Sequence, residues 1–435
     1  VFIKWREYYY KKLLHTDTLT QIPNKQYFMK TAEKILDNNS DKSYLLTSLD
    51  ARNFKLINER FGHIVGDQTL MNIAKNIKSK FHKNGLYARS QGDSFLILVE
   101  DTSQNRELLK SLVDLDISIH NTTNYKVPLK IGVCPIPRYN PALSLSLYID
   151  RANIAKKYTS ARNTNYICYF TDDMNKKLNM KNMIESEMVR ALSKGEFVVY
   201  YQPKYELAND TIIGAEALVR WNHKEKGIIS PGVFIPVFER NGFIVDLDFY
   251  VYEQVLKMQK HRLDMGKKVI PISMNVSRCH LSDTNFVDKL EAVVAKYKVP
   301  KQYIEMEITE SIFSQEDSSA IALIYNLKEH GFTISMDDFG SGYSSLNLLR
   351  KVQIDTLKID KVFIDSTEDV QRSQVIVEEI INMASKIHVK TICEGVETQS
   401  QRDFLKNAGC NMVQGYFYSK PLPYEDFSDL LNSSK

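Results

Sequence analysis

Acids, an asparagine, a lysine and a glutamine stand at the ends of successive apolar runs in the second half of the chain. They are Glu216, Asn275, Glu307, Asp337 with Asp338, Lys358, Glu394 and Gln414. Carboxylates at the C-terminal ends of parallel strands converge on one pocket in a β/α barrel. Several acids in one pocket repel one another unless cations bind them, so the pattern predicts a site for a hard metal ion.

The ligand types narrow the choice of metal. Carboxylate and amide oxygens favour Mg²⁺ or Mn²⁺, whereas zinc sites more often recruit His or Cys. The five cysteines are scattered and form no Cys-x-x-Cys pair; they are Cys134, Cys168, Cys279, Cys393 and Cys410. This argues against a zinc site and a disulfide framework, and it predicts a reducing compartment, the cytoplasm.

The elements that must position these residues alternate between strand and helix from about Phe197 onward. The span 185–435 has about the length of one (β/α)₈ barrel. Residues 15–172 mix helices with short β-rich runs, which predicts an α/β sandwich. Between them, 173–184 is predicted to be a helical linker. Residues 1–14 carry apolar side chains at helical spacing, which fits a signalling helix stub and fits a frayed end equally well.

Composition excludes several classes of function. The 435 residues are 43% apolar and 25% charged, which is ordinary for a globular protein, and the net charge of +4 gives no case for nucleic-acid binding. No apolar run approaches the roughly 18 residues of a membrane span, so no membrane contact is expected within this chain. Because the chain begins with Val1, we expect it to belong to a longer protein whose upstream region could hold a sensor or a membrane anchor.

Three separated motifs resemble one family. Glu216-Ala217-Leu218, Asp337-Asp338-Phe339-Gly340 and Glu394-Gly395-Val396-Glu397 are similar to the signature motifs of the EAL family of cyclic-di-GMP phosphodiesterases. A single Glu-Ala-Leu triplet occurs inside many helices, so the joint order of the motifs carries the resemblance, which covers essentially all of 185–435. It implies a TIM-like barrel that linearises cyclic di-GMP to pGpG with Mg²⁺ or Mn²⁺.

The resemblance also implies roles for single residues. One metal ion would be held by Glu216, Asn275, Glu307 and Asp337. Asp337 would bridge to a second ion held with Asp338 and Glu394. The expected catalytic residues are Glu216, Glu394, Lys358, which would orient the attacking water or meet the phosphate, and Glu310, which would brace the loop after Asp338. Substrate contacts are expected from Gln202, Arg220, Asp360, Glu397 and Gln414, among which the Arg220 fork suits a phosphate. Family members tend to pair through the loop after Asp338, so a homodimer is expected.

The first domain resembles a second family. Asp17-Thr-Leu-Thr-Gln-Ile-Pro-Asn24, Phe54-Lys-Leu-Ile-Asn58 and Phe61-Gly-His-Ile-Val-Gly-Asp67 are similar to segments of the GGDEF family, the diguanylate cyclases. Positions matching base-reading, glycine and metal-binding residues of that family are Asn58, Asp67, Gly92, Asp50 and Asp93. They imply that GTP could bind as an allosteric ligand.

The signature loop of this domain departs from the family. Gln91 replaces the first glycine and Ser94 replaces the acid. Arg52 stands where many members have a second Asp, Tyr158 where a phosphate-binding Lys is expected, and His82–Gly85 lacks the inhibitory motif. We therefore expect no cyclase activity, and the domain is either a GTP-binding regulator or a scaffold.

The sequence thus favours a cyclic-di-GMP phosphodiesterase with a two-metal site, regulated by an impaired cyclase domain. Two alternatives remain open. A non-enzymatic receptor would bind cyclic di-GMP without hydrolysis, and a bifunctional enzyme would also make product from GTP, which Gln91 and Ser94 speak against.

Overall fold

The computed structural model describes residues 14–119, 123–159, 166–313, 318–340, 349–364 and 370–433. Contacts divide the chain into two compact units, one up to Met180 and one from Lys181. Helix α7 (Asp172–Ser193) runs across this division and includes the predicted linker 173–184. The domain bounds drawn from the sequence stay predictions, and the helix expected over 1–14 falls outside the described residues except for Leu14.

The first unit is built on one six-stranded sheet with the order β2-β3-β1-β5-β4 and β6 beside β5. Its strands are β1 (Tyr44–Ala51), β2 (Gly85–Gln91), β3 (Ser94–Glu100), β4 (Asp114–Ile119), β5 (Thr123–Ile136) and β6 (Ile167–Tyr169). All neighbours are antiparallel except β5 and β6, which are parallel. The helices are α2 (Lys25–Asn38), α3 (Phe54–Phe61), α4 (His63–Phe81), α5 (Ser103–Lys110) and α6 (Leu145–Lys157).

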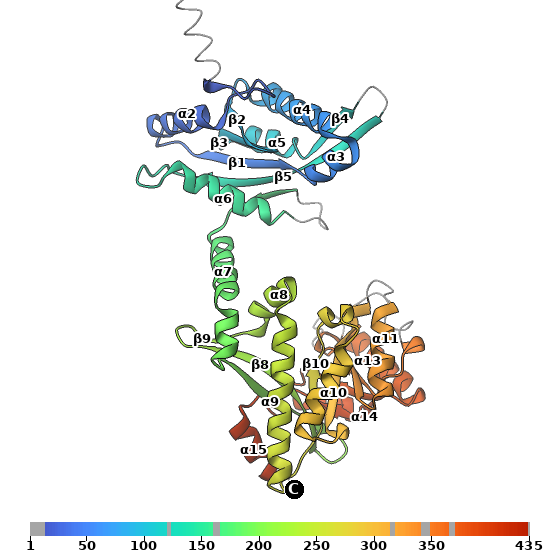
Figure 1. The fold of residues 1–435 in the computed structure, drawn as a ribbon. Helices are drawn as coiled ribbons and strands as arrows, with labels where there is room; N and C mark the ends of the chain where they lie inside the picture. Colours follow the sequence, from blue (N-terminus) through green and yellow to red (C-terminus); the bar gives the residue numbers. More distant parts are fainter. Residues whose placement is uncertain are drawn as a thin grey trace, which may run out of the picture. The chain divides into compact units, whose positions relative to one another are not determined.

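Alternation along β1 explains why helices cover both faces of this sheet. Leu45 and Leu49 pack into a core shared with α4, whereas Leu46 packs into a second core shared with α2 and α6. Because successive side chains of a strand point to opposite faces, a strand with apolar side chains on both faces requires cover on both sides. Figure 1 shows α4 and α6 on opposite faces of the sheet. The predicted α/β sandwich is confirmed.

The second unit is a closed barrel. Its strands are β7 (Phe197–Glu206), β8 (Thr211–His223), β9 (Gly227–Ile229), β10 (Ile272–Asn275), β11 (Ile304–Thr309), β12 (Thr333–Phe339), β13 (Thr356–Ile359), β14 (Lys390–Cys393) and β15 (Met412–Val413). In the described part of the chain, eight of them form a ring in the order β8-β10-β11-β12-β13-β14-β15-β7, and β7 pairs back with β8. The predicted TIM-like barrel is confirmed. One strand departs from the parallel pattern, because β7 is antiparallel to both β8 and β15.

Helices surround the ring and bury its outer face (Figure 1). They are α8 (Pro231–Asn241), α9 (Ile244–Asp264), α10 (Phe286–Tyr297), α11 (Ser318–Glu329), α13 (Val370–Lys386), α14 (Gln399–Asn407) and α15 (Tyr424–Ser433), with short 3₁₀ turns η1 (Arg278–Ser282), η2 (Lys301–Tyr303), η3 (Glu310–Phe313) and η4 (Lys361–Phe363). Met274, Met306 and Met336 pack outward into this core. Because side chains alternate between the two faces of a strand, the residues on either side of each methionine point into the barrel. Among the described helices, none combines the length and apolar character needed to cross a bilayer.

Candidate active site in the barrel

Each strand of the ring contributes a polar side chain to one end of the barrel. They are Gln202 from β7, Glu216 from β8, Asn275 from β10, Glu307 from β11, Asp337 from β12, Lys358 from β13, Glu394 directly after β14 and Gln414 directly after β15. All were predicted from the sequence as site residues. The barrel brings together residues that are up to about half the chain apart, as its closed geometry requires.

Lys358 lies at the centre of four carboxylates, which we call the acid cluster: Glu216, Glu307, Asp337 and Glu394. Its ammonium Nζ is 2.6 Å from Glu394 Oε1, 3.0 Å from Asp337 Oδ1, 3.1 Å from Glu307 Oε2 and 3.5 Å from Glu216 Oε2. The Lys358 side chain is 1% exposed. One buried ammonium group therefore contacts all four carboxyl groups.

The electrostatics of the acid cluster reflect this imbalance. Burial and repulsion from Glu307 raise the pKa of Glu216. Burial, opposed by Lys358, raises the pKa of Glu394 to about 8. Burial would also raise the pKa of Glu307, but attraction to Lys204 and Lys358 outweighs it and lowers that pKa to about 2. Neighbouring carboxylates repel one another when they are ionised, and a bound cation would relieve this repulsion. The electrostatics therefore favour a site for added cations.

Amide side chains close the rim of the cluster. Gln414 Nε2 donates to Glu216 Oε2 at 2.7 Å and to Gln202 Oε1 at 3.0 Å. Asn275 Nδ2 lies 3.5 Å from Glu216 Oε1. Gln414 Oε1 is buried and has no hydrogen-bond partner among the described residues. An unpaired buried oxygen beside the acids is available to a ligand.

The acid pair at the end of β12 has an unusual backbone. Asp338 has a φ of +57°, and its N–H donates to Asp337 Oδ1 at 2.9 Å. Burial, Asp337 and Asp360 together raise the pKa of Asp338 to about 6. Gly340 also has a positive φ, of +97°, and a side chain there would collide with Phe363. The positive φ of Asp338 interrupts the alternation that would place the two side chains on opposite faces of a regular strand, and Asp337 lies near enough to raise the pKa of Asp338.

Glu310 contacts the same turn from η3. Its Oε2 accepts a hydrogen bond of 2.8 Å from the N–H of Gly340. Glu310 therefore touches the loop that the resemblance implies it braces. The rest of that loop, 341–348, lies outside the described residues, as does the dimer contact expected there.

A divalent ion fits the donor chemistry of the site. Glu216, Asn275, Glu307, Asp337, Asp338 and Glu394 offer only oxygen donors, apart from the Asn275 amide nitrogen, and acids outnumber Lys358. In the described residues, however, no three side chains of His, Cys, Asp and Glu already converge as ligands of one ion. Lys358 lies between four of these carboxylates. The two-metal ligand set stays a prediction.

Three predicted substrate-contacting residues lie around the cluster rather than in it. Arg220 follows Glu216 by four residues on β8, is half-buried and lies over the ring of Tyr200, 5.8 Å from its centroid. Asp360 accepts a hydrogen bond from the N–H of Val362 and so caps η4. Glu397 is exposed at the entry to α14. Their substrate roles stay predictions.

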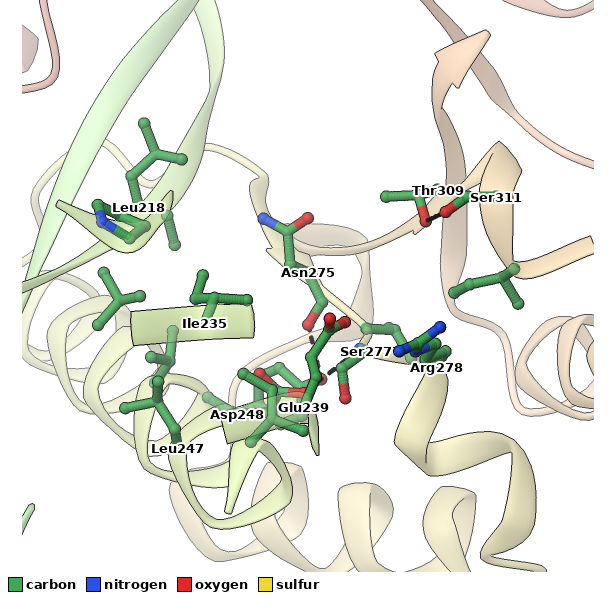
Figure 2. A pocket seen from close by; sticks show the side chains of 18 residues that line it. Leu218, Ile235, Glu239, Leu247, Asp248, Asn275, Ser277, Arg278, Thr309 and Ser311 are labelled. Atoms are coloured by element: carbon green, nitrogen blue, oxygen red, sulfur yellow. Dashed lines mark hydrogen bonds between the residues drawn. The ribbon is translucent and has the colours of Figure 1, made fainter. Parts of the chain in front are cut away.

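A pocket of about 250 Å³ opens beside Asn275. Apolar side chains that include Leu218 and Ile235 line one part of it, and Glu239 and Arg278 lie near the other (Figure 2). The pocket thus combines an apolar slot with charged groups next to the acid cluster. Such a combination is typical of a small-molecule site.

Sequence reasoning missed a polar group behind the cluster. Lys204 Nζ lies 2.8 Å from Glu307 Oε1 and 3.1 Å from Glu305 Oε2, and it contacts Ser273 Oγ. Each of the three new residues lies two positions along its strand from a predicted site residue. The period of two could have identified them, since it places them on the same inner face.

In the first unit, two predicted acids lie close together. Asp50 on β1 is paired with Lys156, whose Nζ is 2.6 Å from Asp50 Oδ1. Asp93 lies in the turn between β2 and β3, where burial and the nearby Asp50 raise its pKa. Gly92 in the same turn has a φ of +60°. Lys156 therefore forms an ion pair with one of the two carboxylates that were expected to bind metal.

The predicted base-reading residues lie on neighbouring helices. Asn58 belongs to α3, and its buried Oδ1 has no partner among the described residues. A side chain at Gly66 would lie 1.9 Å from that oxygen, so Gly66 leaves the space Asn58 needs. Asp67 is exposed on α4. GTP binding by these residues stays a prediction.

The departures from the cyclase signature are on or near the surface. Gln91 is exposed and pairs across the turn with Ser94. The Tyr158 hydroxyl donates to the carbonyl oxygen of Met174 at 3.3 Å. Neither contact brings an acid to the position where Ser94 replaces the acid of the family signature.

Comparisons with known proteins match both halves. The EAL domain model matches residues 185–421, and the model of the diguanylate cyclase GGDEF domain matches residues 14–164. The chain is 28% identical over 415 residues to the bifunctional diguanylate cyclase/cyclic di-GMP phosphodiesterase MucR of Pseudomonas aeruginosa, covering 94% of this chain and 60% of MucR. It is 30% identical over 421 residues to the cyclic di-GMP phosphodiesterase PdeR of Escherichia coli, covering 94% and 62%. The chain therefore spans less than two thirds of the length of these relatives.

A solved structure supports the barrel. The PaMucR phosphodiesterase in complex with cyclic di-GMP has a TM-score of 0.54 and 32% identity to this chain. The match covers 56% of this chain and 99% of that structure.

Proposed function

The chain belongs to the EAL domain family, with a GGDEF domain ahead of the EAL domain, and we propose on this basis that it hydrolyses cyclic di-GMP to pGpG. The observation that carries the proposal is the acid cluster, to which a carboxylate comes from each of β8, β11, β12 and the end of β14, with Lys358 among them. The complex of MucR with cyclic di-GMP supports the substrate.

The reaction breaks one phosphodiester bond with a water molecule. The water oxygen attacks phosphorus in line, the bond from phosphorus to the ribose 3′-oxygen breaks, and that oxygen leaves with a proton. Mg²⁺ or Mn²⁺, held by Glu216, Asn275, Glu307, Asp337, Asp338 and Glu394, would supply the Lewis acidity that this chemistry needs. Lys358 carries three N–H donors and can orient the water or neutralise charge developing on the phosphate.

The pocket beside Asn275 supports binding of one guanine base. Its apolar side accepts the faces of a ring, and the half-buried carboxylate of Glu239 can accept hydrogen bonds from the N–H groups of a guanine edge. Arg220, half-buried on the same strand as Glu216, has the fork that suits a phosphate.

The impaired signature of the first unit supports a regulatory role for it. Gln91 and Ser94 remove a glycine and an acid, and Lys156 neutralises Asp50. A base pocket can persist after in-line chemistry is lost, so this domain would bind GTP without converting it. The expected homodimer is part of the same proposal.

A hydrolysis assay tests the function. The purified chain with Mg²⁺ or Mn²⁺ should convert cyclic di-GMP to pGpG, followed by chromatography. Glu216→Ala should retain less than about one hundredth of the rate, because it loses a carboxylate of the cluster. Glu329→Ala, an exposed acid on α11, is the control and should be as active as the unmodified chain. Tight binding of cyclic di-GMP without pGpG under either metal would favour the receptor alternative instead.

A further inference from the structure

A second polar layer lies inside the barrel beneath the acid cluster. It consists of Lys204 from β7, Ser273 from β10 and Glu305 from β11, and each is two residues along its strand from a residue at the barrel mouth. All three are buried, with Lys204 only 3% and Ser273 0% exposed. A lysine at this depth must have a partner, because an unpaired buried charge is strongly destabilising.

Lys204 contacts three side chains, and one of them is Glu307 of the acid cluster. The ammonium donates to Glu307 Oε1 at 2.8 Å and to Glu305 Oε2 at 3.1 Å, and it contacts Ser273 Oγ. Ser273 Oγ in turn donates to Glu305 Oε2 at 2.5 Å. Three acceptors use the three N–H donors of the ammonium, so Lys204 has a fixed orientation.

Glu307 is held at both oxygens as a result. Oε1 is bound by Lys204 from below, and Oε2 faces Lys358 at 3.1 Å in the acid cluster. Only Oε2 is therefore presented to the centre of the site. Groups behind a metal-binding side chain commonly set its orientation in this manner.

We propose that Lys204 is a positioning residue that holds one carboxylate oxygen of Glu307 and thereby presents the other to a divalent ion. The inference rests on the proposed function. Glu305 compensates the charge of Lys204, and Ser273 fixes the position of both. A buried ion pair is seldom retained for stability, since well-packed apolar residues often replace it without loss.

The competing explanation is that Lys204 and Glu305 are only a structural pair. Removing Lys204 alone would not distinguish the two, because it also adds net negative charge next to the ion site. The double variant Lys204→Met/Glu305→Gln keeps the net charge and closely preserves side-chain volume. It removes the hydrogen bond to Glu307 without changing the charge of the interior.

Titration calorimetry with Mn²⁺ on the full chain measures the effect. We expect the double variant to bind Mn²⁺ about ten- to a hundredfold more weakly, with kcat for cyclic di-GMP reduced and KM nearly unchanged. The control is Ser428→Ala on α15, which removes a buried hydrogen bond from Arg262 in the same unit. It should lower the melting temperature and leave Mn²⁺ affinity as it was.

Each outcome decides the matter. Unchanged Mn²⁺ affinity in a folded double variant overturns the positioning role. If the double variant does not fold, Ser273→Ala takes its place: a weaker Mn²⁺ affinity supports the role, and an unchanged one rejects it. Failure of the unmodified chain to bind Mn²⁺ or to form pGpG would instead count against the proposed function.

Discussion

At the scale of single residues, Lys358 and Lys204 both touch Glu307, yet they should act in opposite directions. Lys358 lies among the carboxylates at the mouth, within 3.5 Å of all four, so its charge occupies the position that an added cation would favour. Lys204 lies behind Glu307 and is compensated by Glu305. We therefore expect Lys358 to compete with the ion, whereas the proposed role of Lys204 is to orient a ligand of that ion.

Lys358→Met should separate binding from catalysis. Removing the ammonium leaves the acid cluster without its cation, so Mn²⁺ should bind at least about tenfold more tightly. The rate constant kcat should fall by about two orders of magnitude, because a donor to the reacting water or phosphate is lost. Calorimetry and the hydrolysis assay measure the two effects.

Thermal unfolding gives a third measurement on this variant. Without metal its melting temperature should fall, and Mn²⁺ should restore it by more than in the unmodified chain, since tighter binding stabilises the folded state further. Lys390→Met, exposed on β14, is the matched control. Equal Mn²⁺ affinity for the two methionine variants would mean that Lys358 does not compete with the ion.

At the scale of elements, helix α9 fixes the segment that follows β10. The hydroxyl of Tyr252 donates to the backbone oxygen of Asn275 at 2.8 Å. One turn earlier, Asp248 Oδ2 accepts from the N–H of Ser277 at 3.3 Å and lies 2.9 Å from His280 Nε2. Residues four apart on a helix share a face, so two adjacent turns of α9 hold this one loop.

Tyr252→Phe should loosen the loop and the site together. Loss of one buried hydrogen bond should lower the free energy of unfolding by about 1 kcal/mol. Mn²⁺ affinity should fall as well, because Asn275 is an expected ligand. Tyr250→Phe is the control on the same helix, since its hydroxyl donates to Phe197 O at 3.0 Å. Tyr250→Phe should lose a similar amount of stability with no change in Mn²⁺ affinity. Equal Mn²⁺ affinities in the two variants would contradict the role of Tyr252 in holding Asn275.

The elements also set what the sequence could predict. Glu216, Glu307 and Asp337 were predictable because each lies on or ends an apolar run, and the barrel brings strand ends together. The reversed direction of β7 was not, because an apolar run reads the same either way. The period of two places Lys204 on the inner face, but its contact with Glu307 depends on which strands become neighbours. The central position of Lys358 was also unpredictable, since sequence spacing does not fix where a long side chain ends.

At the scale of the whole molecule, the chain has two units with separate cores. The barrel core includes Met306 and Leu290, and the first unit has its own pair of cores on either face of its sheet. Separate cores allow one unit to lose its chemistry while the other keeps it. The GGDEF domain can then persist for ligand binding alone.

GTP should therefore alter hydrolysis without being consumed. We expect it to change the affinity of the full chain for cyclic di-GMP by about fivefold or more, the lower range of ordinary allosteric coupling. Gly66→Ala should abolish both GTP binding and this change, because the new methyl group would displace the Asn58 amide from 1.9 Å away. Hydrolysis without GTP should be unaffected, as it should in the control Ser79→Ala on the same helix. Calorimetry without a GTP signal, together with kinetics indifferent to GTP, would reduce the first domain to a scaffold.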